Sequence, residues 1–110
     1  MTVTHIVQFQ FKSTASPAEV KDTCDRMLAL KTNCIHPTSQ KPYIKASSGG
    51  KDNSIEGLQN GITHVFVVEF ESVEDRDYYV QKDSAHLEFV KSLGAVLEKA
   101  QVVDFTPGAF

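Results

Sequence analysis

Two stretches of this chain alternate between apolar and polar residues, and each begins with the dipeptide Thr-His. The first covers residues 4–11 and the second covers residues 63–70. A period of two is typical of a β-strand with one buried face. In both predicted strands the histidine lies on the more apolar face. We therefore expect the imidazoles of His5 and His64 to point into a core or a pocket.

A helical pattern follows each of these strands. Ser16, Pro17 and Glu19 supply a capping hydroxyl, a first-turn proline and a capping-box glutamate, so we expect a helix to start here and run to about Thr32. Its apolar stripe consists of Ala18, Val20, Cys24, Met27, Leu28 and Leu30. Ser72, followed by acidic residues, starts the second helical stretch.

The second helical stretch should break near residues 82–84. From Asp83 onward, a further helical piece carries His86 at the head of an apolar stripe, so this imidazole should also face inward. The other members of the stripe are Val90, Leu93 and Leu97.

Three more segments complete the predicted secondary structure. A short second strand is expected at Tyr43–Ala46, ended by the Ser-Ser-Gly-Gly residues 47–50. The polar residues 51–60 lack periodicity and should form a surface loop. The last strand is expected at Gln101–Phe105.

The order strand, helix, strand therefore occurs twice, which predicts the α+β fold class. The expected architecture is a ferredoxin-like four-stranded antiparallel sheet with helices on one face. The other face is half polar, which suits burial against a second copy of the chain, so we expect a homodimer closed sheet to sheet. The residues of that face are Ile6, Gln8, Gln10, Thr63, Val65, Val67 and Glu69.

Composition limits the class of protein. A length of 110 residues predicts one domain, residues 1–110. The net charge of -3, with both signs interspersed, argues against a protein that binds nucleic acid or an anionic membrane, which would carry a basic patch. No apolar run approaches the roughly 20 residues that span a bilayer, so a soluble, cytoplasmic protein is expected.

Cys24 and Cys34 lie roughly 15 Å apart along one helix, which predicts reduced thiols.

The candidate chemistry rests on His5, His64, His86 and Tyr79. An imidazole titrates near neutral pH and a phenol donates a hydrogen bond to a developing enolate, so a shared dry cavity would allow proton transfer on a ketone or phenol. The alternative for each residue is a structural place in the core. A zinc or copper site is a weaker alternative, because no helical His-x-x-x-His pair is present, and we expect neither a metal nor a cofactor. His36, before Pro37, is expected to be a solvated turn residue.

Five segments together resemble the stress-responsive dimeric α+β barrel family. They are Thr4–Val7, Gly61–Val65, Phe70–Glu74, Asp83–His86 and Val103–Pro107, so the resemblance covers essentially the whole chain. It implies a ferredoxin-like protomer that dimerises through its sheet into a barrel, with a pocket between sheet and helices in each protomer.

The same resemblance implies roles for individual residues. One plant member of the family closes a linear poly-β-keto thioester by an intramolecular aldol condensation, and its catalytic tyrosine and histidine match Tyr79 and His86. His5 and His64 match two further pocket histidines, which implies substrate-binding roles. The first hypothesis is thus a lyase or cyclase acting on a ketide-like or phenolic small molecule. The second is a non-enzymatic stress-response or ligand-binding protein whose histidines line a structural cavity.

Overall fold

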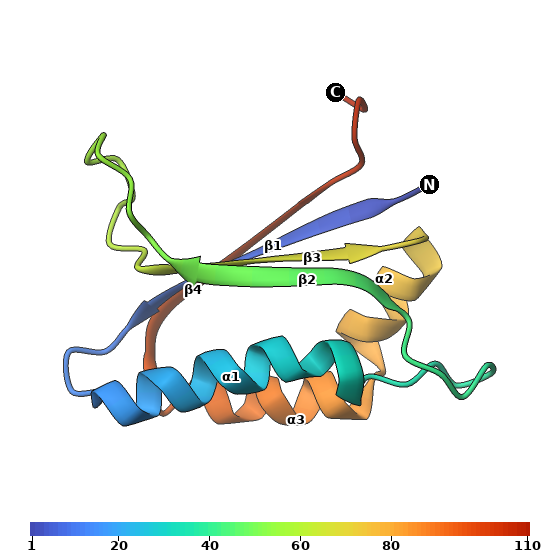
Figure 1. Cartoon of the computed structure of the whole chain (residues 1–110), viewed down its shortest axis with the longest axis horizontal. Coiled ribbons are helices and arrows are strands. Elements are labelled where there is room, and N and C mark those ends of the chain that lie inside the picture. The colour runs from blue at the N-terminus through green and yellow to red at the C-terminus, as the bar shows by residue number, and fades with distance from the viewer.

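The computed structural model describes all residues from 1 to 110 and places them in four strands and three helices (Figure 1). The elements are β1 (Val3–Phe11), α1 (Pro17–Asn33), β2 (Ile44–Lys51), β3 (His64–Phe70), α2 (Val73–Gln81), α3 (Ser84–Leu93) and β4 (Leu97–Phe105). The strands form one antiparallel sheet in the order β2-β3-β1-β4. This is the α+β ferredoxin-like fold expected from the sequence.

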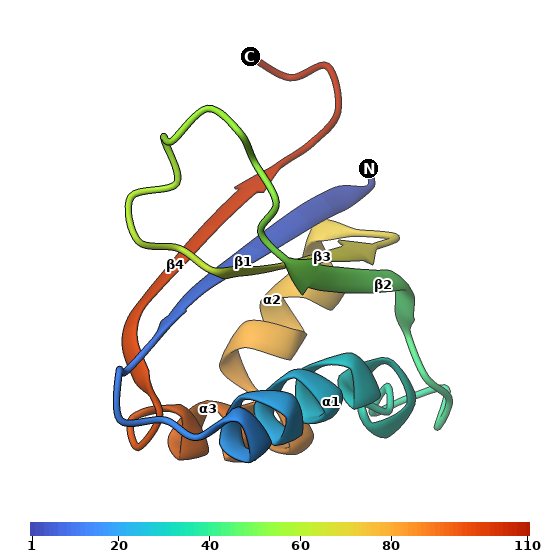
Figure 2. The same cartoon turned by 60° about the vertical axis from the view of Figure 1, so that its left-hand side comes forward.

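The helices cover only one face of the sheet. Helices α1 and α3 lie side by side beneath it, and α2 connects β3 to α3 (Figures 1 and 2). The core lies between these helices and the sheet, and its buried members are Val7, Phe9, Met27, Leu30, Cys34, Tyr43, Ile44, Phe66, Val68, Phe70, Tyr79 and Phe89. The opposite face carries no helix. The loop after β2 and the C-terminal tail both extend on that open side (Figure 2).

The helix boundaries follow the capping signals in the sequence. The Ser16 hydroxyl accepts a hydrogen bond from the backbone N–H of Glu19 at 3.1 Å, and the Glu19 carboxylate accepts one from the backbone N–H of Ser16 at 2.8 Å. The helix ends at Asn33, one residue beyond the expected end. The expected break is confirmed, because Lys82 ends α2 and Asp83 caps α3.

The second strand is longer than expected. The sequence predicts that residues 47–50 terminate this strand, but these residues pair with β3, and β2 continues to Lys51. The two glycines are part of the strand, and Gly49 has a packing reason: a Cβ at this position would lie 2.2 Å from Cδ1 of Phe66. Glycine therefore marks a close approach of backbone to a ring here, and not a turn.

The last strand begins four residues earlier than expected. The sequence pattern predicts that Leu97 belongs to the helical stripe headed by His86, but α3 ends at Leu93 and Leu97 is the first residue of β4. It pairs with Phe11 across an irregularity in the register of β1. Leu97 follows Leu93 by four residues, a helical spacing, but the short turn at Gly94 ends the helix between them.

The open face of the sheet presents a row of apolar side chains. Ile6 in the middle of β1 lies opposite Val67 of β3 and Val103 of β4. Val103 is 47% exposed in the single chain.

The cysteines are free thiols, as expected. None of the three helices combines the length and apolar character that crossing a membrane requires.

Candidate functional site

A cavity of about 490 Å³ lies between the inner face of β1 and β4 and the helices α2 and α3. Three of the residues singled out in the sequence line it, namely His5, Tyr79 and His86. The remaining wall is mostly apolar and consists of Val7, Phe9, Met27, Arg76, Val80, Phe89, Val90, Leu93, Ala100, Val102 and Asp104. This volume and this mixture of an apolar wall with a few polar groups are typical of a small-molecule site.

Tyr79 and His86 meet because the helical stretch is interrupted between them, where α2 ends and α3 begins. Asp83 starts α3 by accepting hydrogen bonds at Oδ1 from the backbone N–H groups of Ala85, at 3.0 Å, and His86, at 3.4 Å. The new helix direction brings the two rings together, with centroids 3.9 Å apart and an interplanar angle of 26°. Nδ1 of His86 lies 2.8 Å from the backbone carbonyl oxygen of Tyr79.

The environment of His86 favours the neutral imidazole. Burial lowers its pKa below the ordinary value of 6.5 and outweighs the hydrogen bond to the Tyr79 carbonyl, which raises the pKa. Smaller effects come from His5, which lowers the pKa, and from Asp83, which raises it. A carbonyl oxygen can only accept a hydrogen bond, so Nδ1 carries the proton. Nε2, which has no hydrogen-bond partner in the protein, then presents a lone pair. This is the state that a general base requires.

The hydroxyl of Tyr79 is a buried donor without a partner. The side chain is 0% exposed, and its oxygen forms no hydrogen bond within the protein. Burial raises the pKa of this phenol, and the negative charges that Cys34 and Asp83 can carry raise it further, so the proton stays on the oxygen. An unsatisfied buried polar group costs about 1–3 kcal/mol of stability. A hydrogen-bond acceptor placed against this oxygen would relieve the cost.

His5 is held by a carboxylate that sequence reasoning did not identify. Its Nδ1 lies 2.7 Å from Oδ1 of Asp104, and Oδ2 of Asp104 accepts a hydrogen bond from Arg76 at 2.8 Å. The ring also lies edge-on to Tyr79, with centroids 5.8 Å apart. Asp104 thus fixes the orientation of the ring. The alternation of the last strand is the sequence pattern that could have identified Asp104. It does so only when the strand register that pairs His5 with Asp104 is known.

A buried carboxylate, that of Asp83, supports the break between α2 and α3. Oδ2 of Asp83 accepts a hydrogen bond from the Tyr43 hydroxyl at 2.6 Å, and Asp83 is only 3% exposed. Burial and this contact raise the pKa of Tyr43. The Asp83 side chain therefore ties the residue that precedes β2 to the start of α3 and positions the helix that carries His86. The sequence indicated Asp83 only as the start of the last helical piece.

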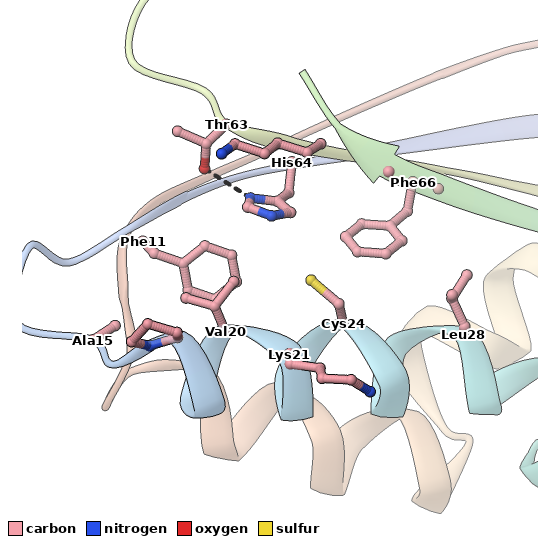
Figure 3. A pocket seen from close by; sticks show the side chains of 13 residues that line it. Phe11, Ala15, Val20, Lys21, Cys24, Leu28, Thr63, His64 and Phe66 are labelled. Carbon is pink, nitrogen blue, oxygen red and sulfur yellow. Dashed lines mark hydrogen bonds between the residues drawn. The ribbon is translucent and has the colours of Figure 1, made fainter. Parts of the chain in front are cut away.

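His64 does not join this cavity. It lines a separate cleft between α1 and the sheet, shown in Figure 3. Phe9 lines the first cavity and Phe66 lines the second, and their rings pack against each other with centroids 5.5 Å apart. The expected meeting of three inward-facing histidines is therefore wrong for His64, because these two rings fill the space between. No group of metal-ligating side chains converges in either place.

The chain has relatives that match it over almost its full length. It is 35% identical over 105 residues to the stress-response A/B barrel domain-containing protein HS1 of Arabidopsis thaliana, which covers 96% of this chain and 89% of that protein. It is 31% identical over 108 residues to olivetolic acid cyclase of Cannabis sativa, with 97% and 98% of the two chains covered.

Solved structures agree with the fold. The hydroxynitrile lyase from Passiflora edulis superposes with a TM-score of 0.83 at 25% identity, covering 99% of this chain and 96% of that one. A dimeric ferredoxin-like protein of unknown function from Thermobifida fusca superposes with a TM-score of 0.73 at 17% identity, covering 96% and 91%. The model of the stress responsive A/B barrel domain matches residues 3–107. The chain therefore belongs to the stress-responsive A/B barrel domain family.

Proposed function

We propose that this chain is a lyase or cyclase that transfers a proton on a small carbonyl or phenolic substrate bound in the His86 cavity. The observation that carries the proposal is the pairing of two groups in one apolar cavity. One is a neutral imidazole with a free Nε2, and the other is a buried phenol with no hydrogen-bond partner. The enzymatic names of two relatives, a cyclase and a hydroxynitrile lyase, support this class of reaction.

Each group has a distinct role in the proposed step. Nε2 of His86 takes a proton from the carbon next to a carbonyl, and the electrons of the broken C–H bond move onto the carbonyl oxygen. The Tyr79 hydroxyl donates a hydrogen bond to the oxygen as its negative charge develops. His5, oriented by Asp104, offers its own Nε2 to hold the substrate. The apolar wall selects a substrate with a hydrocarbon or aromatic body.

We further propose that the active form is a homodimer closed through the open face of the sheet. The row of Ile6, Val67 and Val103 gives that face an apolar centre. The single chain leaves Val103 and Phe105 each 47% exposed, which burial against a second copy would correct. The dimeric ferredoxin-like protein of the same fold gives a precedent for such an assembly.

The proton transfer can be tested before the natural substrate is known. Phenylacetone has an aromatic body and a carbon acid beside its carbonyl, and the exchange of its α-hydrogens in D₂O is followed by NMR. The wild type should accelerate exchange, and His86→Ala should reduce this acceleration by about 10²–10⁴-fold, the usual contribution of a general base. His36→Ala removes a histidine that lies outside the cavity, so it should leave the acceleration of exchange unchanged.

Two results would contradict the enzymatic proposal. One is full activity in His86→Ala. The other is saturable binding of phenylacetone without any exchange above the buffer rate, which would favour a ligand-binding protein.

A further inference from the structure

The cleft that contains His64 is larger than the His86 cavity and separate from it. Its volume is about 650 Å³, and it opens between α1 and the ends of β2 and β3 (Figure 3). The packed rings of Phe9 and Phe66 divide it from the other cavity. Neither His86 nor Tyr79 lines it. Whatever occupies this cleft would thus not contact the groups that carry the proposed proton transfer.

One part of the cleft is an apolar trough. Val20, Cys24 and Leu28 on α1 face Phe11 and Phe66 on the sheet across the gap in Figure 3. The trough stays open because the residues that could fill it have small side chains or none. Cys24 occupies the middle of the helix side, and Gly49 and Gly50 occupy the neighbouring strand edge. An aromatic or acyl group fits such a surface.

The other part of the cleft is polar and positively charged. The Thr63 hydroxyl lies 3.4 Å from the Phe9 carbonyl, to which it donates, and its oxygen accepts a hydrogen bond from Nδ1 of His64 at 2.9 Å. Nε2 of His64 is left without a protein partner. The Lys51 ammonium forms no ion pair, whereas Lys21 is bound to Asp25 at 2.6 Å.

The titratable groups lining the cleft beside His64 are Lys51 from β2 and Lys21 and Cys24 from α1, whereas β1 contributes the apolar Phe11. Burial lowers the pKa of His64, and the charge of Lys51 lowers it further. The lining contains no aspartate or glutamate, although the chain as a whole has a net charge of -3. A positive end next to an apolar trough is complementary to an anion with a hydrocarbon body.

We propose that this cleft is a second ligand site, which binds a small amphiphilic carboxylate. The hydrocarbon body lies between Leu28 and Phe66, and the carboxylate contacts the Lys51 ammonium and Nε2–H of the protonated His64. A bound carboxylate favours the imidazolium, so binding takes up a proton and tightens as the pH falls through the titration of His64. The proposal does not depend on the proton-transfer function of the other cavity.

Octanoate is a suitable probe, with octanamide as its neutral counterpart. NMR of the four imidazoles should show saturable shifts of His64 with octanoate, weaker ones with octanamide, and a rise in the pKa of His64 in the complex. Lys51→Gln should weaken octanoate binding by about tenfold, the loss of one charge-assisted contact. Lys45→Gln removes a lysine from the same strand outside the cleft and should have no effect.

A chemical readout checks the location independently. Octanoate should slow the alkylation of the half-buried Cys24 by iodoacetamide, with the fully buried Cys34 as an internal reference. The proposal is overturned if octanoate shifts His5 and His86 in place of His64, if octanamide binds equally well, or if Lys51→Gln binds octanoate as the wild type does. Lys51→Gln should leave phenylacetone exchange unchanged, so failure of this site and failure of the proton transfer are distinguishable.

Discussion

The imidazole of His86 lies almost flat on the ring of Tyr79, with centroids 3.9 Å apart, and it hydrogen-bonds the backbone carbonyl of that same residue. Tyr79 therefore fixes His86 through its ring and its backbone, whereas its hydroxyl takes no part in this contact. The two features can be separated by substitution. Removal of the hydroxyl alone keeps the stacked ring and the orientation of His86.

Tyr79→Phe should abolish most of the phenylacetone exchange without lowering stability. The substitution removes a buried donor that has no partner, so the free energy of unfolding should stay constant or rise by up to about 1 kcal/mol. Urea unfolding monitors stability and α-hydrogen exchange monitors activity. Tyr43→Phe is the matched control, because it removes a hydroxyl that donates to the buried Asp83 and should cost about 1.5–3 kcal/mol. Equal destabilisation by both variants would show that the Tyr79 hydroxyl has a partner.

The fold could be predicted because its signals are local. The alternation in β1 and β3, the caps at Ser16 and Ser72 and the helix break near Asp83 each depend on a few neighbouring residues. The end of β2 could not be predicted in the same way. Glycine is used there because Phe66, distant in the sequence, occupies the side-chain position of Gly49. A glycine that allows close packing and one that allows a turn look identical in a sequence.

The candidate site could be predicted only in part. The proximity of Tyr79 and His86 follows from a helix break that local residues encode. The separation of His64 depends on the volume of two phenylalanine rings that pack across strands, which no periodicity reveals. The contact of Asp104 with His5 depends on strand register in the same way. Sequence patterns identified the inward-facing residues, but not which of them share a cavity.

Stability should decrease as the solution becomes acidic, in part through His86. Its pKa in the folded protein lies below the ordinary value of 6.5, so the unfolded chain binds the proton more tightly. His86 therefore leaves the free energy of unfolding undiminished above a pH of about 6.5, and it lowers this free energy as the pH falls below that value. Urea unfolding at fixed protein concentration should show this slope in the wild type and a smaller one in His86→Gln. The remaining slope should include His64, whose pKa is also lowered. An unchanged slope in His86→Gln would contradict the assignment.

Gly49→Ala should be much more destabilising than Gly50→Ala. A Cβ at Gly49 would lie 2.2 Å from Cδ1 of Phe66, a ring that is 1% exposed and packed against Phe9. Displacement of this ring should cost about 1–3 kcal/mol. A Cβ at Gly50 meets nothing within 4 Å, so alanine there should be neutral or stabilise the strand by about 0.5–1 kcal/mol. Chemical unfolding of both variants measures the difference. Equal effects would mean that Phe66 can move freely.

Val103→Glu should convert the proposed homodimer into a monomer. Val103 lies beside Ile6 on the open face, so the new carboxylate would be buried without a partner between two sheets, at a cost of several kcal/mol. Val73→Glu is the control, because Val73 is also part-exposed, at 37%, but lies in the first turn of α2, where the helix dipole favours an acid. Sedimentation equilibrium at micromolar concentration should find the wild type and Val73→Glu dimeric and Val103→Glu monomeric.

The melting temperature of the wild type should also fall on dilution, because unfolding of a dimer depends on its concentration. A wild type that sediments as a monomer would exclude the sheet-to-sheet assembly. A dimeric Val103→Glu would place the interface elsewhere on the chain.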